Sequence, residues 1–210
     1  MPIPLRIIVL ISGSGTNLQA LIDEEKSDTN CPYTICGVFS DKKSAYGLER
    51  AKAAQIPTEI VSASMSLGER FQSASRDEKR FAISNRILEL AKKYQGDAIV
   101  LAGFLSVLTG KLLEDYRGKI INLHPALLPK FGGEGMWGHH VHEAVLASGE
   151  KESGCTVHFV DAGCDTGKII LQRKVPVLPH DTVESLYQRI APEEHKAIVE
   201  ALKRLATGQI

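Results

Sequence analysis

Apolar and polar positions divide the chain into short apolar runs separated by amphipathic segments. In the first half, apolar runs cover residues 5–11, 33–40, 58–61, 98–102 and 119–122. Segments with helical spacing lie between them, at 16–25, 46–55 and about 70–94. Runs that are apolar on both faces are typical of parallel strands covered by helices. The pattern therefore predicts an α/β fold with a doubly wound, mostly parallel sheet and right-handed crossovers.

The second half of the chain carries a different pattern. Strand-like segments at 154–160 and 169–177 follow one another without a helical stretch between them, so we expect them to pair antiparallel. A helix from 182 to about 205 follows, and Asp181 with Glu184 fits a helix start with reciprocal capping. Since no repeat or linker interrupts the pattern, we expect a single domain over residues 1–210.

Composition narrows the class of protein. Lys plus Arg and Asp plus Glu both number 25, giving a formal net charge of +0, which argues against broad binding to nucleic acid or anionic membrane. No run approaches the roughly 20 apolar residues of a membrane span. The four cysteines lack metal-binding or redox spacing, so we expect a reducing, cytoplasmic location and a buried structural thiol at Cys155.

A glycine loop joins the first predicted strand to the first predicted helix. It reads Ser12-Gly13-Ser14-Gly15-Thr16-Asn17, and its glycines allow backbone N–H groups to approach an anion at a helix start. Leu18 replaces the third glycine of the dinucleotide-binding motif, and no Gly-Lys-Ser/Thr follows. A phosphate monoester suits so small a loop. The alternative is a tight turn with Thr16 as the helix N-cap.

Polar side chains emerge at the end of the predicted strand at 119–122. Asn122 and His124 are two residues apart, which places them on one face, and Pro125 ends the strand. Ligands of open α/β sheets bind at this edge, and an amide beside an imidazole suits acyl transfer. Asp165, in a later turn, would raise the pKa of a nearby imidazole. The alternatives are a structural Asn–His pair and an ordinary turn aspartate.

The other histidines give weaker signals. His139 and His142 have helical spacing, but His140 points elsewhere and no carboxylate motif accompanies them, so we expect no metal site. His158 shares a strand face with Thr156 and receives no separate role. His180 is expected in an exposed loop and His195 in the middle of a helix.

Taken together, these segments resemble the folate-dependent formyltransferase family over nearly the whole chain. The resemblance rests on VLISGSGTNLQALID, IVLAGFLSVL, INLHPALLPKF and GCTVHFVDAGCDTGKIILQ. INLHPALLP with a later Asp-x-Gly is specific to the family, and GSGTNLQ points to its phosphoribosylglycinamide formyltransferase branch. The resemblance implies a Rossmann-like fold and formyl transfer from 10-formyltetrahydrofolate to the amine of glycinamide ribonucleotide, in de novo purine biosynthesis. It implies no metal, and a monomer or homodimer.

The resemblance also implies roles for particular residues. The catalytic residues would be Asn122, His124 and Asp165. The ribonucleotide would bind at Gly15, Thr16, Asn17 and Glu194. Folate would bind at Arg76, Leu105, Ser106, Val107, Leu108, Asn122 and Asp165. Residues up to about 100 would thus serve the phosphate, and residues from about 101 would serve folate and catalysis.

The sequence departs from the family pattern at two places. Ser106 stands where bacterial members often carry a basic residue. The segment 131–142 is longer and richer in glycine than usual, although His140 and His142 match a His-x-His of the family. Its Trp137 either packs over the site or lies on a mobile lid.

Three alternative functions stay open. A 10-formyltetrahydrofolate hydrolase uses a similar trio with water as acceptor, but usually carries an extra N-terminal domain, whereas this chain begins at the first strand. Methionyl-tRNA formyltransferase needs an added C-terminal domain and a basic surface. A phosphosugar-binding module would keep the glycine loop and perform no chemistry.

Overall fold

The computed structural model describes residues 3–210, which divide into two compact units with the boundary between Ile120 and Ile121. The sheet has seven strands, in the order β3 (Thr58–Ile60), β2 (Tyr33–Ser40), β1 (Leu5–Ile11), β4 (Ala98–Leu101), β5 (Ile120–His124), β6 (Glu152–Phe159) and β7 (Ile169–Pro176). β1 pairs parallel with β2 and β4, and β2 pairs parallel with β3. β6 pairs antiparallel with both β5 and β7. The predicted mostly parallel α/β sheet with an antiparallel C-terminal portion is confirmed.

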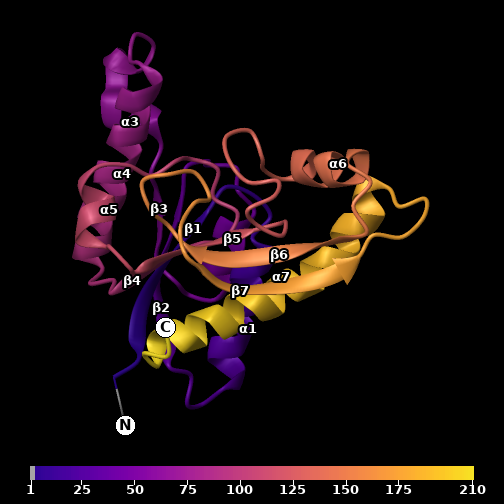
Figure 1. Ribbon diagram of the computed structural model, residues 1–210. Helices are drawn as coiled ribbons and strands as arrows, with labels where there is room; N and C mark the ends of the chain where they lie inside the picture. Colours follow the sequence, from indigo (N-terminus) through magenta and orange to yellow (C-terminus); the bar gives the residue numbers. More distant parts are fainter. Residues whose placement is uncertain (1–2) are drawn as a thin grey trace. The chain divides into compact units, whose positions relative to one another are not determined.

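The first unit holds most of the helices (Figure 1). Its elements, in chain order, are β1 (Leu5–Ile11), α1 (Thr16–Ser27), β2 (Tyr33–Ser40), α2 (Gly47–Ala53), β3 (Thr58–Ile60), α3 (Ala63–Leu67), the 3-10 helix η1 (Gly68–Phe71), α4 (Arg76–Lys93), β4 (Ala98–Leu101) and α5 (Lys111–Asp115). β1 forms the centre of its core, because residues 7–11 are fully buried. Burial of five successive residues on both faces is what parallel strands between helices require.

The second unit is built around a long helix and an antiparallel ribbon. Its elements are β5 (Ile120–His124), which begins at the boundary, α6 (His139–Ala147), β6 (Glu152–Phe159), β7 (Ile169–Pro176) and α7 (Val183–Ala206). α7 lies along β6 and β7 (Figure 1). Its buried face repeats every four residues, at Leu186, Ile190, Glu194, Ile198 and Leu202. Glu194 is therefore a charged residue on an otherwise apolar buried stripe.

The long helix expected at about 70–94 is wrong at its start. α4 begins at Arg76, because Ser75 and Glu78 form a capping box: Ser75 Oγ accepts from the Glu78 N–H at 3.2 Å, and the Glu78 carboxylate accepts from the Ser75 N–H at 2.8 Å. The preceding residues form α3 and η1 instead.

The expected cap of the last helix is also wrong, by one residue. Thr182 is the N-cap of α7, and its reciprocal partner is Ser185 rather than Glu184. Asp181 instead forms an ion pair with Arg189 at 2.7 Å, and its pKa lies well below the usual range chiefly because of the hydrogen bonds from Arg189. Asp181 thus stabilises the helix start from outside.

Across residues 3–210, no helix combines the length and apolar character needed to cross a membrane.

Candidate active site

A polar cluster occupies the end of β5 and its neighbour β6. The antiparallel register places Asn122 opposite His158 and His124 opposite Thr156. Asp165 follows in the loop between β6 and β7, where its backbone has a φ of 58°, a left-handed conformation that Asp tolerates better than most residues. The structure therefore brings together Asn122, His124 and Asp165, the three residues predicted to be catalytic, and adds His158.

The Asp165 carboxylate is the centre of this cluster. Its Oδ1 lies 3.4 Å from Asn122 Nδ2 and 3.5 Å from His158 Nε2. Its Oδ2 lies 3.5 Å from His124 Nδ1 and accepts a hydrogen bond from the Gly133 N–H at 3.0 Å. One side chain thus connects both histidines, the amide and the segment that follows β5.

Backbone carbonyls determine which imidazole nitrogens carry protons. His124 Nε2 lies 2.7 Å from the Phe131 carbonyl oxygen, and because a carbonyl only accepts, Nε2 carries a proton. A second proton on His124 would sit on Nδ1, facing Asp165. His158 Nδ1 donates to the Phe159 carbonyl at 2.8 Å, so its Nε2, when neutral, accepts from Asn122 Nδ2 at 3.1 Å.

Burial and charge act in opposite directions on His124. Its side chain is 4% exposed, and burial lowers its pKa below the usual value by more than the charge of Asp165 raises it. The expectation that the carboxylate gives a net increase in this pKa is therefore wrong for the ligand-free chain. Burial also opposes ionisation of Asp165, but the neighbouring His158 ring, the charge that His124 can carry and the hydrogen bond from the Gly133 N–H leave the Asp165 pKa lowered. At neutral pH Asp165 is ionised and His124 is mainly neutral.

His158 is a member of the cluster that the sequence did not single out. It is 2% exposed and bonded at both ring nitrogens. The sequence signal that could have identified His158 was its position on the same strand face as Thr156. Thr156 is itself buried, and its hydroxyl donates to the Ala126 carbonyl at 2.6 Å. What the sequence lacked was the register of β6 against β5, which only the structure supplies.

The glycine loop lies in the first unit, between β1 and α1. Gly15 is the N-cap of α1, with a φ of 72° and no side-chain cap, so the alternative in which Thr16 caps the helix is wrong. Thr16 and Asn17 are the first two helical residues, and the first turn of α1 contains no acidic side chain. Their N–H groups lie in the first turn of a helix, the end that attracts anions.

The residues predicted to contact folate in the first unit lie in two places. Residues 105–108 follow β4, where the Leu105 N–H donates to Ser12 Oγ at 2.9 Å. The Ser106 hydroxyl donates to Asp41 Oδ2 at 2.7 Å, so it is already engaged by an acidic neighbour. Arg76 is the first residue of α4 and is exposed.

Glu194 and Cys155 interact electrostatically inside the second unit. Cys155 has no solvent exposure, as expected for a structural thiol. Burial first, and then the negative charge of Glu194, raises the Cys155 pKa to about 12. Glu194, the residue predicted to reach the ribose, is 7% exposed on the β6-facing stripe of α7. All four cysteines of the chain are free thiols.

His139, His140 and His142 lie in the first turn of α6. His139 and His142 both pack against the Tyr187 ring, with centroid distances of 5.9 and 6.0 Å. Trp137 is half exposed and stacks edge-on with His140 at 4.9 Å. Among residues 3–210, no group of three or more His, Cys, Asp or Glu side chains is arranged to hold a metal ion.

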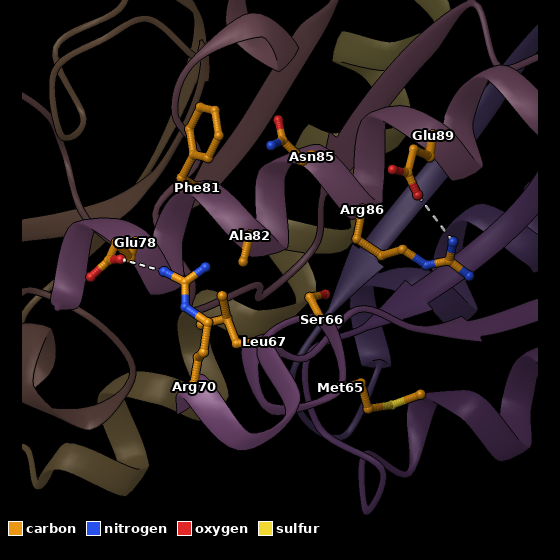
Figure 2. A pocket seen from close by; sticks show the side chains of 10 residues that line it. All are labelled: Met65, Ser66, Leu67, Arg70, Glu78, Phe81, Ala82, Asn85, Arg86 and Glu89. Atoms are coloured by element: carbon orange, nitrogen blue, oxygen red, sulfur yellow. Dashed lines mark hydrogen bonds and ion pairs between the residues drawn. The ribbon is translucent and has the colours of Figure 1, made fainter. Parts of the chain in front are cut away.

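A separate concavity of about 640 Å³ lies in the first unit, between α4 and the α3–η1 segment (Figure 2). Its arginines are neutralised within the wall, since Arg70 pairs with Glu78 at 3.0 Å and Arg86 pairs with Glu89 at 3.1 Å. None of the residues predicted for the active site lines it. This concavity is therefore distinct from the polar cluster and the glycine loop.

Comparison with known proteins identifies the family of this chain. The profile of the Formyl transferase family matches residues 5–202. The chain belongs to the formyl transferase family. Within it, the chain is 36% identical to phosphoribosylglycinamide formyltransferase of Escherichia coli (strain K12), over 98% of this chain and 89% of that protein. It is 44% identical to the trifunctional purine biosynthetic protein adenosine-3 of Chironomus tentans, covering 98% of this chain but only 14% of that larger protein.

Solved structures of formyl transferases agree with this assignment. Glycinamide ribonucleotide transformylase 1 from Symbiobacterium toebii superimposes with a TM-score of 0.85 at 40% identity, covering 98% of this chain and 89% of that one. A formyltetrahydrofolate deformylase from Pseudomonas syringae shares the fold, with a TM-score of 0.82, but only 22% identity. This formyl transferase is thus similar in sequence to the ribonucleotide branch, and to the deformylase in fold alone.

Proposed function

We propose that this formyl transferase moves the formyl group of 10-formyltetrahydrofolate onto the amine of glycinamide ribonucleotide. The products are formylglycinamide ribonucleotide and tetrahydrofolate, and the reaction belongs to de novo purine biosynthesis. The observation that carries the proposal is the Asn122–His124–Asp165 cluster, in a chain 36% identical to a phosphoribosylglycinamide formyltransferase over most of both proteins.

The proposed reaction needs no nucleophile from the protein. The neutral amine attacks the formyl carbon, and the carbonyl oxygen becomes an oxyanion. The Asn122 amide is the proposed donor to that oxygen, and the His124 ring stabilises its charge once the ring has taken up a proton. Asn122 Nδ2 lies 3.4 Å from Asp165 Oδ1, so the hydrogen bond between them is long and weak. The N–H that makes this bond is the one proposed to turn to the oxyanion.

Proton movement follows from the same residues. The attacking amine must lose one proton and N10 of folate must gain one as the C–N10 bond breaks, so the two transfers balance. Because His124 is mainly neutral in the free chain, its Nδ1 can take the proton from the amine and hold it against Asp165, 3.5 Å away. Asp165 then stabilises the resulting imidazolium until the proton passes on.

The remaining site residues receive binding roles in this proposal. We assign the phosphate of the ribonucleotide to Gly15, Thr16 and Asn17, and the ribose to Glu194. We assign folate to the backbone of 105–108, with Asn122, Asp165 and Arg76. The supporting features are the position of these residues at the N-terminus of α1 and the absence of acidic residues in its first turn.

The site is proposed to act within a single formyltransferase domain spanning residues 1–210, in the cytoplasm, as a monomer or homodimer. The hydrolase alternative is supported by fold alone, since the deformylase is 22% identical. The binding-module alternative is disfavoured because the cluster keeps every group that the chemistry requires, with Asp165 bonded to its partners.

An activity assay with purified protein and both substrates tests the proposal. We expect wild type to form formylglycinamide ribonucleotide at an enzymatic rate, and His124→Ala to reduce kcat by at least about 100-fold, the range of lost acid–base catalysis. His180→Ala, at an exposed loop position, is the matched control and should retain full activity. Ribonucleotide binding without any product from wild type would support the binding module instead.

A further inference from the structure

Arg50 of α2 lies against the glycine loop, outside the residues proposed to bind the substrates. Its Nε donates to the Ser14 carbonyl oxygen at 2.9 Å, and its Nη1 donates to Gln19 Oε1 on α1 at 3.1 Å. The Tyr46 ring lies beneath the guanidinium, with the Arg50 Cζ 5.1 Å from the ring centroid. Three contacts, two of them directional, therefore hold the guanidinium in one orientation.

The bond to Ser14 sets the direction of the next N–H. The Ser14 carbonyl and the Gly15 N–H belong to one planar trans peptide, in which the two groups point in opposite directions. Fixing the carbonyl toward Arg50 therefore aims the Gly15 N–H away from Arg50. This N–H is one of the donors assigned above to the phosphate.

Close backbone packing holds α2 near enough for this contact. A Cβ on Gly15 would lie 2.6 Å from Gly47 Cα, and the Gly47 N–H donates to the Gly13 carbonyl at 3.0 Å. Side chains on either glycine would push α2 and the loop apart. The two glycines thus bring the guanidinium of Arg50 within hydrogen-bonding distance of Ser14.

The guanidinium also supplies charge. An arginine side chain stays positive throughout the physiological pH range, and a charged donor on a carbonyl polarises the peptide and strengthens its N–H as a donor. A lysine could restore the charge but not both directional bonds, because its ammonium lacks the planar fork.

We infer that Arg50 is a positioning residue for the phosphate of the ribonucleotide, acting through the Ser14–Gly15 peptide, and that it favours a doubly charged phosphate ester over an uncharged sugar. The inference rests on the proposed function. The competing view is that Arg50 merely ties α2 to α1.

Two substitutions separate these views. Arg50→Gln removes the charge and should raise KM for glycinamide ribonucleotide by about tenfold or more, the size expected for a lost charge-assisted bond. kcat and KM for 10-formyltetrahydrofolate should stay within about twofold. Arg50→Lys should recover part of the loss, and added salt should weaken ribonucleotide binding more in wild type than in Arg50→Gln. Arg86→Gln, on α4, is the matched control and should change neither KM.

An equal rise in both KM values together with a lower melting temperature would overturn the inference in favour of a simple tie, as would an unchanged ribonucleotide KM. If Arg50→Gln does not fold, the same KM comparison is made with Arg50→Lys. Calorimetric titration with ribose 5-phosphate tests Arg50 independently of the reaction. Weaker binding by the variants would support the inference even if wild type transferred no formyl group, and equal binding would overturn it.

Discussion

At the scale of single residues, the cluster shows how burial and pairing compete on one imidazole. His124 gains a carboxylate neighbour but loses nearly all contact with water, and the loss is the larger effect on its pKa. The ring is thereby suited to accept a proton during the reaction rather than to carry one beforehand. Asp165 remains ionised beside it, ready to stabilise the charge once it forms.

This coupling leads to a prediction for a double-mutant cycle. Asp165→Asn and His124→Ala should each lower kcat by roughly 100-fold or more while changing ligand affinity much less. The double variant should lose far less than the product of the two single losses, because each residue acts through the other. The measurement is kcat and KM for all four proteins. Multiplicative losses would show that the two residues do not act as a pair.

Some residues of the site could be predicted from the sequence and others could not. Asn122 and His124 share a strand that ends at a proline, so their common face followed from local pattern alone. His158 could not be predicted, because its place beside Asn122 depends on the pairing of β6 with β5, 36 residues apart. The direction of the His124 pKa was also missed, because burial depends on tertiary packing that no local pattern encodes.

At the scale of elements, the packing of the glycine loop predicts that alanine at Gly15 and alanine at Gly13 have very different effects on stability. Gly15→Ala forces a Cβ onto a φ of 72° and to within 2.6 Å of Gly47 Cα, and should lower the free energy of unfolding by roughly 2–4 kcal/mol. A Cβ on Gly13 meets no atom within 4 Å, so Gly13→Ala should change stability by less than about 0.5 kcal/mol. Urea unfolding measures both. Equal stabilities would contradict the packing described for α2.

His142 of α6 should make the stability of the protein depend on pH. His142 is 1% exposed, its Nδ1 has no hydrogen-bond partner among the described residues, and burial, followed by the charges of His139 and His124, lowers its pKa to about 4. The unfolded chain takes up this proton near pH 6.5, whereas the folded chain resists it. Stability from this residue is therefore present at neutral pH and lost progressively as pH falls from about 6.5 toward 4.

Between pH 7 and pH 5 the loss should amount to roughly 2 kcal/mol, since one pKa unit corresponds to about 1.4 kcal/mol. Urea unfolding of His142→Gln should show a loss smaller by that amount over the same range. His140→Gln, at an exposed position on the same helix, is the control and should keep the wild-type slope. An unchanged slope in His142→Gln would mean that His142 does not titrate as its burial requires.

Helices and strands could be predicted from the sequence where the pattern of apolar residues is strong. They could not be predicted where capping residues determine the start of a helix. β1 and β2 match their apolar runs, because burial on both faces gives an uninterrupted signal. α4 begins later than its pattern suggests because the Ser75–Glu78 capping box starts the helix at Arg76, after the 3-10 helix has ended at Phe71. The five-residue helices α3 and α5 are too short for any period to appear.

At the scale of the whole molecule, the two kinds of strand pairing follow from the sequence. Helical segments separate the parallel strands, and their absence between β6 and β7 allows the antiparallel hairpin. The change of pattern between the two halves of the chain indicates two parts, but it does not predict that the compact units are divided at residue 120. The function proposed for the whole chain depends on which acceptor receives the formyl group, since an amine and water would use the same cluster.

The most direct test follows the formyl carbon itself. Purified protein is given 10-formyltetrahydrofolate labelled with ¹³C in the formyl group, with and without glycinamide ribonucleotide, and the labelled products are identified by mass spectrometry. With the amine present, the label should appear in formylglycinamide ribonucleotide at the same rate as tetrahydrofolate forms. Without it, tetrahydrofolate should form only slowly. Labelled formate released at an equal rate with and without the amine would contradict the account and identify water as the acceptor.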